Sequence, residues 1–372
     1  MDSVVAHRPQ IMPGRLITAA QLRALLPPSP PLLALVRETR ESLTRIVARE
    51  DSRLAVIVGP CSIHDPRAAL DYARRLGPLR EAYRDALEIV MRVYLEKPRT
   101  TLGWKGLIND PDLDGSYRID EGLQRARQLL IDIHALGVPA ATEFLDLMTV
   151  RYIDDLVSWA AIGARTTESP MHRQAASGLP LPIGFKNGTD GDVKVALEAL
   201  AAARAPHHYL TVSMDGRIEA VSSRGNCAAH IVLRGGLRPN FDRATIDTVC
   251  GALARSGIAP SVVVDASHGN SGKVARAQVD VCADLAQRIS NGETRVAGVM
   301  IESNLAPGRQ DVVHGVPLVY GKSITDECLG WSDTVDLIRL LARAVRTQRR
   351  TALVQRASGY TDAQGGCLGT IH

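Results

Sequence analysis

The feature that most limits the possible folds is a repeated alternation of short apolar runs and helix-like segments. Eight runs between residues 54 and 301 read as strands, and most are followed by a stretch with helical periodicity. They span residues 54–58, 88–94, 139–142, 160–164, 183–186, 230–234, 261–265 and 296–301. Eight βα units are the number that closes a barrel, so we predict an α/β protein with a (β/α)8 TIM-barrel fold.

Three segments do not follow this alternation of strands and helices. Residues 1–50 form an N-terminal extension, in which PPSPP at 27–31 separates helix-like segments 18–25 and 32–48. Between the fifth and sixth barrel strands, HHYLTVSMDGRIEAVSS predicts an inserted β-hairpin near 207–226 that turns at Asp215 and Gly216. Residues 347–372 are polar and contain glycine, which predicts a poorly ordered tail. The barrel itself is expected over residues 51–346.

Composition argues against several classes of protein. The net charge is +4, from 44 Lys and Arg against 40 Asp and Glu, so no strong basic field favours nucleic acid as a partner. No apolar run approaches the roughly 20 residues of a membrane helix, so no membrane partner is expected. The six cysteines include no CxxC pair and no secretory leader is recognisable, which favours a reducing cytoplasm.

Charged side chains follow the predicted strands. The loops after the strands of a (β/α)8 barrel gather at one face, so residues distant in sequence converge there. Any single cation of this kind is more often a surface charge or a structural ion pair. Five at strand ends instead predict a cleft for phosphate and carboxylate groups, with Glu143 orienting their side chains. These cations are Arg92, Lys97, Arg165, Lys186 and Arg234.

A second set of strand-end residues has metal-ligand chemistry. Cys61, His268 and Glu302 end the first, seventh and eighth strands, which are neighbours in a closed barrel, and Asp326 lies in the next loop. Mixed sulfur, nitrogen and oxygen ligands suit one divalent Mn, Fe, Co or Zn ion. Spacing alone is weak support, because a lone buried cysteine is usually a small hydrophobe. Cys61 as a nucleophile with His268 as its base is the alternative.

Long motifs then carry a family resemblance over residues 16–346. In order they are GPCSIHDP, EKPRTTLGWKGLINDPDLDGSY, GARTTES, GFKNGTDG, HIVLRGG, DASHGNS, GVMIESN and YGKSITDECLGW. Together they resemble the class I 3-deoxy-D-arabino-heptulosonate-7-phosphate (DAHP) synthases. The resemblance implies a transferase (EC 2.5.1.54) that condenses phosphoenolpyruvate with erythrose 4-phosphate, the first step of the shikimate pathway, at a divalent metal.

The resemblance also implies roles for individual residues. The metal ligands would be Cys61, His268, Glu302 and Asp326, and the phosphoenolpyruvate contacts would be the five strand-end cations. The KPRT segment would bind erythrose 4-phosphate through Lys97, Pro98, Arg99 and Thr100. Lys97 would deliver a proton to the new alkoxide, for which we expect neighbouring cations to lower its pKa.

The resemblance further implies feedback inhibition by an aromatic amino acid and assembly into a homodimer or homotetramer. Val150, Arg151 and Pro180 depart from the phenylalanine-sensitive pattern, so tryptophan or tyrosine is favoured over phenylalanine. Tryptophan is slightly preferred, because DPDLDGSY and TEFLDL are closer to that branch. The inhibitor pocket would include Phe144, Leu179, Pro180, Tyr209, Thr211 and Val221.

Two rival functions stay open. One is a related condensation, that of 3-deoxy-D-manno-octulosonate-8-phosphate synthase, although the long KPRTTLGWKGLIND motif, the hairpin and the N-terminal extension argue against it. The other is a non-catalytic regulatory homologue that keeps the barrel and the amino-acid pocket. Such a homologue would show degraded ligand or cation positions, and every predicted position here keeps a functional residue type.

Overall fold

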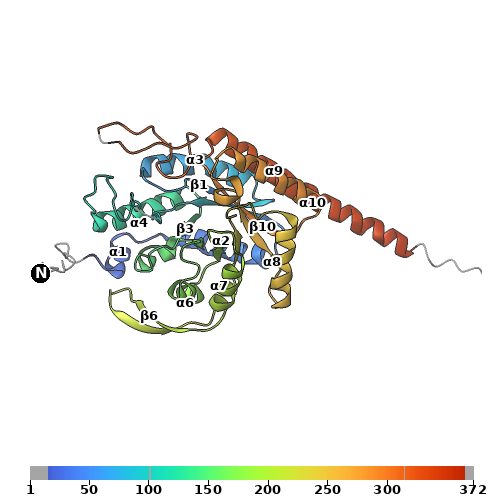
Figure 1. Ribbon diagram of the computed structural model, residues 1–372, viewed down its shortest axis with the longest axis horizontal. Helices are drawn as coiled ribbons and strands as arrows, with labels where there is room; N and C mark the ends of the chain where they lie inside the picture. The colour runs from blue at the N-terminus through green and yellow to red at the C-terminus, as the bar shows by residue number, and fades with distance from the viewer. Residues whose placement is uncertain (1–15, 100–101, 314, 365–372) are drawn as a thin grey trace, which may run out of the picture.

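The computed structural model describes residues 16–99, 102–313 and 315–364, with side chains as far as residue 354. Eight parallel strands form a closed barrel in the order β1-β10-β9-β8-β5-β4-β3-β2. Helices lie around these strands (Figure 1). The predicted (β/α)8 barrel is confirmed, and no predicted strand end is more than two residues from the observed one. The strands are β1 Leu54–Gly59, β2 Leu87–Arg92, β3 Ala140–Glu143, β4 Trp159–Ile162, β5 Ile183–Lys186, β8 His230–Leu233, β9 Val262–Asp265 and β10 Val296–Glu302.

Helices surround the strands and begin where the sequence supplies caps. Asp65 caps the first outer helix by accepting hydrogen bonds from the backbone N–H groups of Arg67 and Ala68, and Pro66 occupies the first turn. The outer helices and short 3-10 segments are α3 Pro66–Ala82, α4 Ile119–Ala135, α5 Val150–Ile153, η1 Asp154–Leu156, α6 Pro170–Gly178, α7 Lys194–Arg204, α8 Arg243–Arg255, η2 His268–Ser271, α9 Ala277–Ser290 and α10 Trp331–Gln364.

The N-terminal extension closes the amino-terminal end of the barrel. Its helices are α1 Ala19–Leu25 and α2 Pro30–Val47. Leu43 and Ile46 of α2 join a buried apolar cluster with side chains inside the barrel, among them Ile57 and Trp159. With α2 packed at this end, the face that is left for ligands is the opposite one, at the carboxyl ends of the strands.

The inserted hairpin is present and lies apart from the barrel sheet. Strands β6 His208–Val212 and β7 Ile218–Ser222 pair antiparallel. Gly216 has a φ of 78°, which the tight turn requires and which glycine adopts without steric cost. At the tip, the carbonyl of Met214 accepts a hydrogen bond of 2.9 Å from the backbone N–H of Ala20 in α1, so the hairpin is tied to the N-terminal extension.

The last helix differs from the sequence prediction. A poorly ordered tail was expected from residue 347, but α10 continues to Gln364 and Figure 1 shows its second half projecting beyond the barrel. The prediction is wrong for residues 347–364, because Arg, Ala, Leu and Gln dominate the first part of this segment and favour helix. Extending an existing helix also avoids the cost of starting a new one. Residues 365–372 lie outside the described residues.

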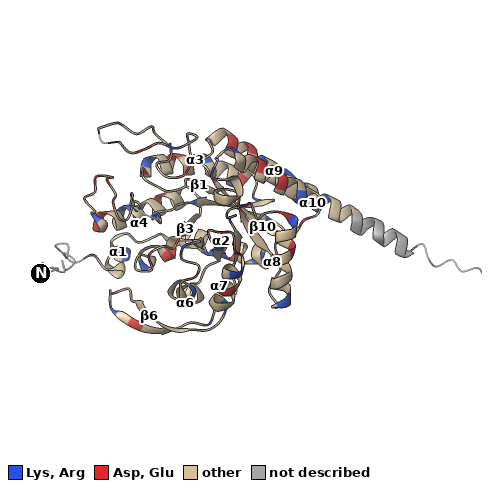
Figure 2. Ribbon diagram, in the orientation of Figure 1, with Lys and Arg blue, Asp and Glu red and all other residues tan. Residues whose placement is uncertain are grey.

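Charges of both signs are mixed on the outer helices, where Figure 2 shows Lys and Arg among Asp and Glu. Within the described residues, no helix combines the length and the apolar character that crossing a membrane requires.

Candidate active site

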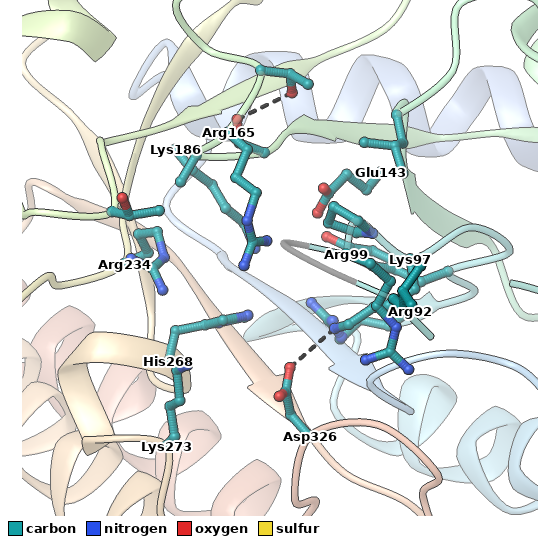
Figure 3. A pocket seen from close by; sticks show the side chains of 18 residues that line it. Arg92, Lys97, Arg99, Glu143, Arg165, Lys186, Arg234, His268, Lys273 and Asp326 are labelled. Atoms are coloured by element: carbon teal, nitrogen blue, oxygen red, sulfur yellow. Dashed lines mark hydrogen bonds and ion pairs between the residues drawn. The ribbon is translucent and has the colours of Figure 1, made fainter. Parts of the chain in front are cut away.

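A cavity of about 280 Å³ lies at the carboxyl ends of the barrel strands. Figure 3 shows Arg165, Arg234, Lys97 and Asp326 pointing into the same space from different loops. The structure therefore brings together most of the residues that the sequence singled out, whereas Thr100 lies outside the described residues. The predicted residues that line the cavity are Arg92, Lys97, Pro98, Arg99, Glu143, Arg165, Lys186, Arg234, His268 and Asp326.

Three of the predicted metal ligands form one group. The Cys61 sulfur and one carboxylate oxygen from each of Glu302 and Asp326 lie within 4.8 Å of one another. The pairing of β1 with β10 sets Gly59 opposite Glu302, which places Cys61 beside the end of β10. Cys61 and Glu302 are buried, whereas Asp326 is partly exposed to the cavity. A thiol and two carboxylates gathered from three segments fit a divalent metal ion.

His268 stands at the edge of this group. Its Nε2 lies 3.7 Å from Oε1 of Glu302, and its Nδ1 lies 3.0 Å from Oδ2 of Asp265. One ring nitrogen thus faces the ligand group and the other faces a carboxylate, which is the usual environment of a metal-binding histidine. Adding His268 to the three other side chains gives a mixed sulfur, oxygen and nitrogen donor set.

Arg92 joins the ligand group to the cavity. Its Nη2 lies 3.0 Å from Oε1 of Glu302, and its guanidinium sits 4.0 Å from the centre of the Tyr94 ring. Burial alone would lower the pKa of Arg92, but Tyr94, Glu302 and Asp265 together raise it above its ordinary value. Nη1 of Arg92 is buried and has no hydrogen-bond partner among the described residues. A fixed cation with an unused donor suits an anionic ligand.

Lys97 has a different environment from the one expected. Its Nζ lies 2.8 Å from the Cys61 sulfur and 3.1 Å from Oδ2 of Asp326. Burial alone would lower the pKa of Lys97, but Cys61, Glu302 and Asp326 raise it well above the ordinary value. The expectation that neighbouring cations lower this pKa is therefore wrong in this arrangement, because the nearest charged groups are anions.

The surroundings of Cys61 strongly raise the pKa of its thiol. Burial, followed by the negative charge of Glu302, raises the pKa of Cys61 to about 12, although Lys97 acts in the opposite direction. Without additional positive charge, Cys61 is therefore a protonated thiol rather than a thiolate. This disfavours a role as a free nucleophile, because the thiolate is the reactive form.

Sequence reasoning missed three residues of this site. Asp265 ends β9 and lies 3.1 Å from Nζ of Lys186, and the strand-end rule that selected its neighbours would have found it. Tyr94 lines the cavity beneath Arg92, and Lys273 lines its outer part. Neither has an equally clear sequence signal. Burial alone would raise the pKa of Asp265, but His268 and Lys186 hold it well below its usual range.

Gly163 is required by the position of Glu143. A Cβ atom at residue 163 would lie 2.3 Å from Oε1 of Glu143, closer than any real contact. Both residues line the cavity. The missing side chain therefore lets the Glu143 carboxylate lie against the β4 loop, directed at the cations.

The predicted inhibitor residues occupy two neighbouring surfaces. Tyr209 pairs with Val221 across the hairpin and Thr211 lies two residues further, so these three side chains share one face. The Tyr209 hydroxyl reaches Gly178 of α6, which brings this face toward the barrel. Leu179 and Pro180 border an open groove of about 800 Å³ beside α2. Phe144 is buried and directly follows Glu143, which lines the cavity.

Glu96, just before Lys97, gives a stability prediction. Burial raises its pKa from 4.5 to about 7, although a hydrogen bond from Thr149 opposes the shift. Because the folded protein then holds a proton that the unfolded chain releases, stability should fall as pH rises from about 4.5 to about 7. Glu96→Gln should remove this loss and raise the free energy of unfolding at pH 8 by up to about 3 kcal/mol, with little change near pH 4.

Urea unfolding at pH 4, 6 and 8 would measure this effect. Glu198→Gln changes an exposed carboxylate on α7 and serves as the control, since it should leave the pH dependence unaltered. A Glu96→Gln variant that loses stability between pH 4.5 and 7 as steeply as the original protein would contradict the prediction.

Comparison with known proteins places the chain in a family. Residues 35–339 match the DAHP synthetase I family. The phospho-2-dehydro-3-deoxyheptonate aldolase of Haemophilus influenzae is 53% identical over 325 residues, which cover 87% of this chain and 90% of the relative. The Phe-sensitive enzyme of Escherichia coli K12 is 54% identical over 314 residues, covering 84% and 90%.

The Trp-sensitive enzyme of Enterobacter agglomerans is 53% identical over 332 residues, which cover 89% of this chain and 95% of the relative. Among solved structures, the phospho-2-dehydro-3-deoxyheptonate aldolase of Francisella tularensis SCHU S4 superposes with a TM-score of 0.88 at 46% identity, covering 90% of this chain and 98% of that one. The chain therefore belongs to the DAHP synthetase I family.

Proposed function

We propose that the protein condenses phosphoenolpyruvate with erythrose 4-phosphate and water, giving DAHP and phosphate as the first step of the shikimate pathway. The observation that carries this proposal is a cavity in which five strand-end cations lie next to a Cys, Glu and Asp group. Family membership supports the same reaction. A reducing cytoplasm suits its free cysteines, and we expect a homodimer or homotetramer.

The metal would be held by Cys61, His268, Glu302 and Asp326. This mixed donor set suits Mn, Fe, Co or Zn better than Mg or Ca. When bound, the ion supplies Lewis acidity that makes the aldehyde of erythrose 4-phosphate more electrophilic. Arg92 and Lys97 then lie next to the ligands and connect them to the substrate cavity.

The cations would hold phosphoenolpyruvate by its phosphate and carboxylate. Arg92, Arg165, Lys186 and Arg234 line the cavity, and their charges would also stabilise the negative charge that develops on the departing phosphate. Glu143 keeps the group from being uniformly positive. Lys97 lies between the ligand group and this cavity, where it can give a proton to the alkoxide that forms at the former aldehyde.

Arg99 would serve the second substrate. It lines both the main cavity and an adjoining one of about 540 Å³ that contains Trp104 and Asp326. With Lys97, Pro98 and Thr100 it would bind the phosphate of erythrose 4-phosphate. The two cavities share Asp326, so the two substrates would meet beside it.

Single substitutions should separate the two substrates. Arg165→Ala should raise KM for phosphoenolpyruvate by about 10- to 100-fold and lower kcat, because a charge-assisted hydrogen bond contributes about 1.5–3 kcal/mol. Arg99→Ala should instead act mainly on KM for erythrose 4-phosphate. Steady-state kinetics with each substrate varied in turn measure both effects. An Arg99→Ala variant whose only defect is in phosphoenolpyruvate binding would show that this division of the cavity is wrong.

A phosphate-release assay tests the proposed reaction. The purified protein should release phosphate only when both substrates are present, and chelator should stop the release until Mn²⁺ or Co²⁺ is added. Arabinose 5-phosphate in place of erythrose 4-phosphate should give little product. Greater activity with arabinose 5-phosphate would favour the related octulosonate condensation, and no activity with either aldehyde would favour a regulatory homologue.

We further propose that the hairpin face of Tyr209, Thr211 and Val221 forms the inhibitor pocket, together with Phe144, Leu179 and Pro180. Tryptophan is the favoured inhibitor, followed by tyrosine. Thr211→Trp should fill the pocket and abolish inhibition with little change in kcat, because Thr211 lies away from the cavity. The expected loss corresponds to an allosteric coupling of about 1–3 kcal/mol.

Leu210→Trp is the matched control, since Leu210 is 72% exposed on the other face of the same strand. Initial rates with millimolar tryptophan, tyrosine or phenylalanine should show inhibition of the control by one of them. Inhibition of Thr211→Trp equal to that of Leu210→Trp would exclude this face as the pocket.

A further inference from the structure

One buried carboxylate contacts both a metal-ligand candidate and a substrate cation. Asp265 is fully buried at the end of β9, and its Oδ2 lies 3.0 Å from Nδ1 of His268 and 3.1 Å from Nζ of Lys186. Oδ2 has no well-aligned hydrogen bond among the described residues, so it holds Lys186 by ion pairing and makes a polar contact with the His268 ring nitrogen. Because His268 belongs to the metal side of the site and Lys186 to the phosphoenolpyruvate side, Asp265 lies where the two meet.

The Ser267 hydroxyl determines which nitrogen of the His268 ring carries the hydrogen. It lies 2.5 Å from Oδ1 of Asp265 and 2.7 Å from Nδ1 of His268. The carboxylate can only accept, so the hydroxyl donates its one proton to Asp265 and must accept from Nδ1. Nδ1 therefore carries the ring hydrogen. In the neutral imidazole, Nε2 then keeps its lone pair on the side that faces Glu302.

The backbone of this segment is held in an uncommon conformation. His268 has a φ of 57°, in the left-handed region that residues with a side chain seldom adopt. Two backbone hydrogen bonds keep it there, from Gly269 N–H to the Arg234 carbonyl at 3.0 Å and from Lys273 N–H to the His268 carbonyl at 2.7 Å. Such strain persists where surrounding contacts enforce it, and it often accompanies a positioned functional group.

We propose that Asp265, acting with Ser267, is a positioning residue that couples metal binding to phosphoenolpyruvate binding. Through Ser267 and Nδ1 it sets the His268 tautomer and ring orientation, and through Oδ2 it holds Lys186 in the cavity. A substitution of Asp265 should then weaken the binding of both the metal and phosphoenolpyruvate, although Asp265 itself contacts neither of them. This role rests on the proposed function, in which His268 binds the metal and Lys186 binds phosphoenolpyruvate.

Two variants separate the two halves of this role. Asp265→Asn removes the charge that pairs with Lys186 and alters the partner of Ser267, so it should weaken both the metal and phosphoenolpyruvate. Ser267→Ala removes only the hydroxyl that binds Nδ1, so it should weaken the metal by about 10-fold or more and leave phosphoenolpyruvate nearly unaffected. Ser271→Ala is the matched control, because its hydroxyl points to the His268 carbonyl at 3.5 Å and not to the ring.

The measurement is equilibrium binding to purified protein. Co²⁺ is titrated into chelator-treated protein and followed by thiolate-to-cobalt absorption, and phosphoenolpyruvate is titrated by calorimetry without erythrose 4-phosphate. Thermal unfolding shows whether each variant is folded. For Asp265→Asn we expect a 10- to 100-fold loss for Co²⁺ and at least a 10-fold loss for phosphoenolpyruvate.

Each outcome bears on the proposal. An effect of Asp265→Asn on only one ligand would overturn the coupling, and wild-type Co²⁺ affinity in Ser267→Ala would overturn the tautomer argument even if Asp265→Asn failed to fold. If the unaltered protein bound neither Co²⁺ nor phosphoenolpyruvate, the proposed function itself would fail. Normal binding by the unaltered protein and by both variants would reject the positioning role alone.

Discussion

Replacing Cys61 with serine is expected to remove most of the bound metal and to lower kcat/KM by about a thousandfold. Cys61 supplies the sulfur of the predicted donor set, and its sulfur lies 3.5 Å from Oδ2 of Asp326. A Lewis acid contributes several kcal/mol to such a transition state, and each 1.4 kcal/mol corresponds to about tenfold in rate. Serine is nearly isosteric, so the barrel should stay folded while the metal affinity falls.

Metal content after dialysis, measured by atomic emission spectrometry, and steady-state kinetics check this expectation. Cys282→Ser is the matched control, because Cys282 is also fully buried but lies on α9 among apolar side chains of the core. The control should lose some thermal stability and keep its metal and its kcat. Full turnover by metal-free Cys61→Ser protein would refute the metal role.

Replacing Lys97 with methionine is expected to lower kcat by about 10²- to 10⁴-fold, the usual contribution of a positioned proton donor. Methionine keeps the length and the apolar stem but removes the ammonium that lies 3.1 Å from Asp326. Because that ammonium also competes for Asp326 and Cys61, metal affinity should be kept or increased. This combination of low kcat and intact metal binding distinguishes Lys97 from the ligands.

Kinetics with Mn²⁺ at saturation and titration of the metal-free protein measure the two properties. Lys105→Met is the control within the same loop, since the Lys105 side chain is exposed and only its backbone carbonyl contacts Lys97. A Lys97→Met variant with normal kcat and a raised KM would show that Lys97 binds substrate without moving a proton.

The barrel could be predicted because each of its strands is recognisable from a few consecutive residues. Each strand is a short run that is buried throughout, so composition alone reveals it, as in residues 183–186, where prediction and observation coincide. The strand-end rule then gathered Arg165, Lys186 and Arg234 without any knowledge of their contacts. The hairpin was equally visible, because a turn at Gly216 follows from the glycine itself.

Two of the misses concern contacts in three dimensions, and the third is a wrong interpretation of local composition. The groups nearest Lys97 come from other loops, namely Cys61 and Asp326. The cations close to Lys97 in the sequence therefore gave no indication of these acidic neighbours. Asp265 looked like part of the motif that carries His268, and only the distance to Lys186 reveals its second contact. The helix beyond residue 347 was missed because polarity and glycine suggested a tail, although α10 was already started at Trp331.

The closure of the barrel between β1 and β10 has a consequence for when the proposed metal could bind during synthesis. Cys61 is made early, but Glu302 belongs to the last barrel strand and Asp326 lies 265 positions after Cys61. A nascent chain that ends before Glu302 would offer only Cys61 and His268 of the four proposed ligands. In the proposed site, the full set of four ligands would therefore form only after translation of almost the whole barrel, so metal loading would be a late step that follows synthesis of the chain.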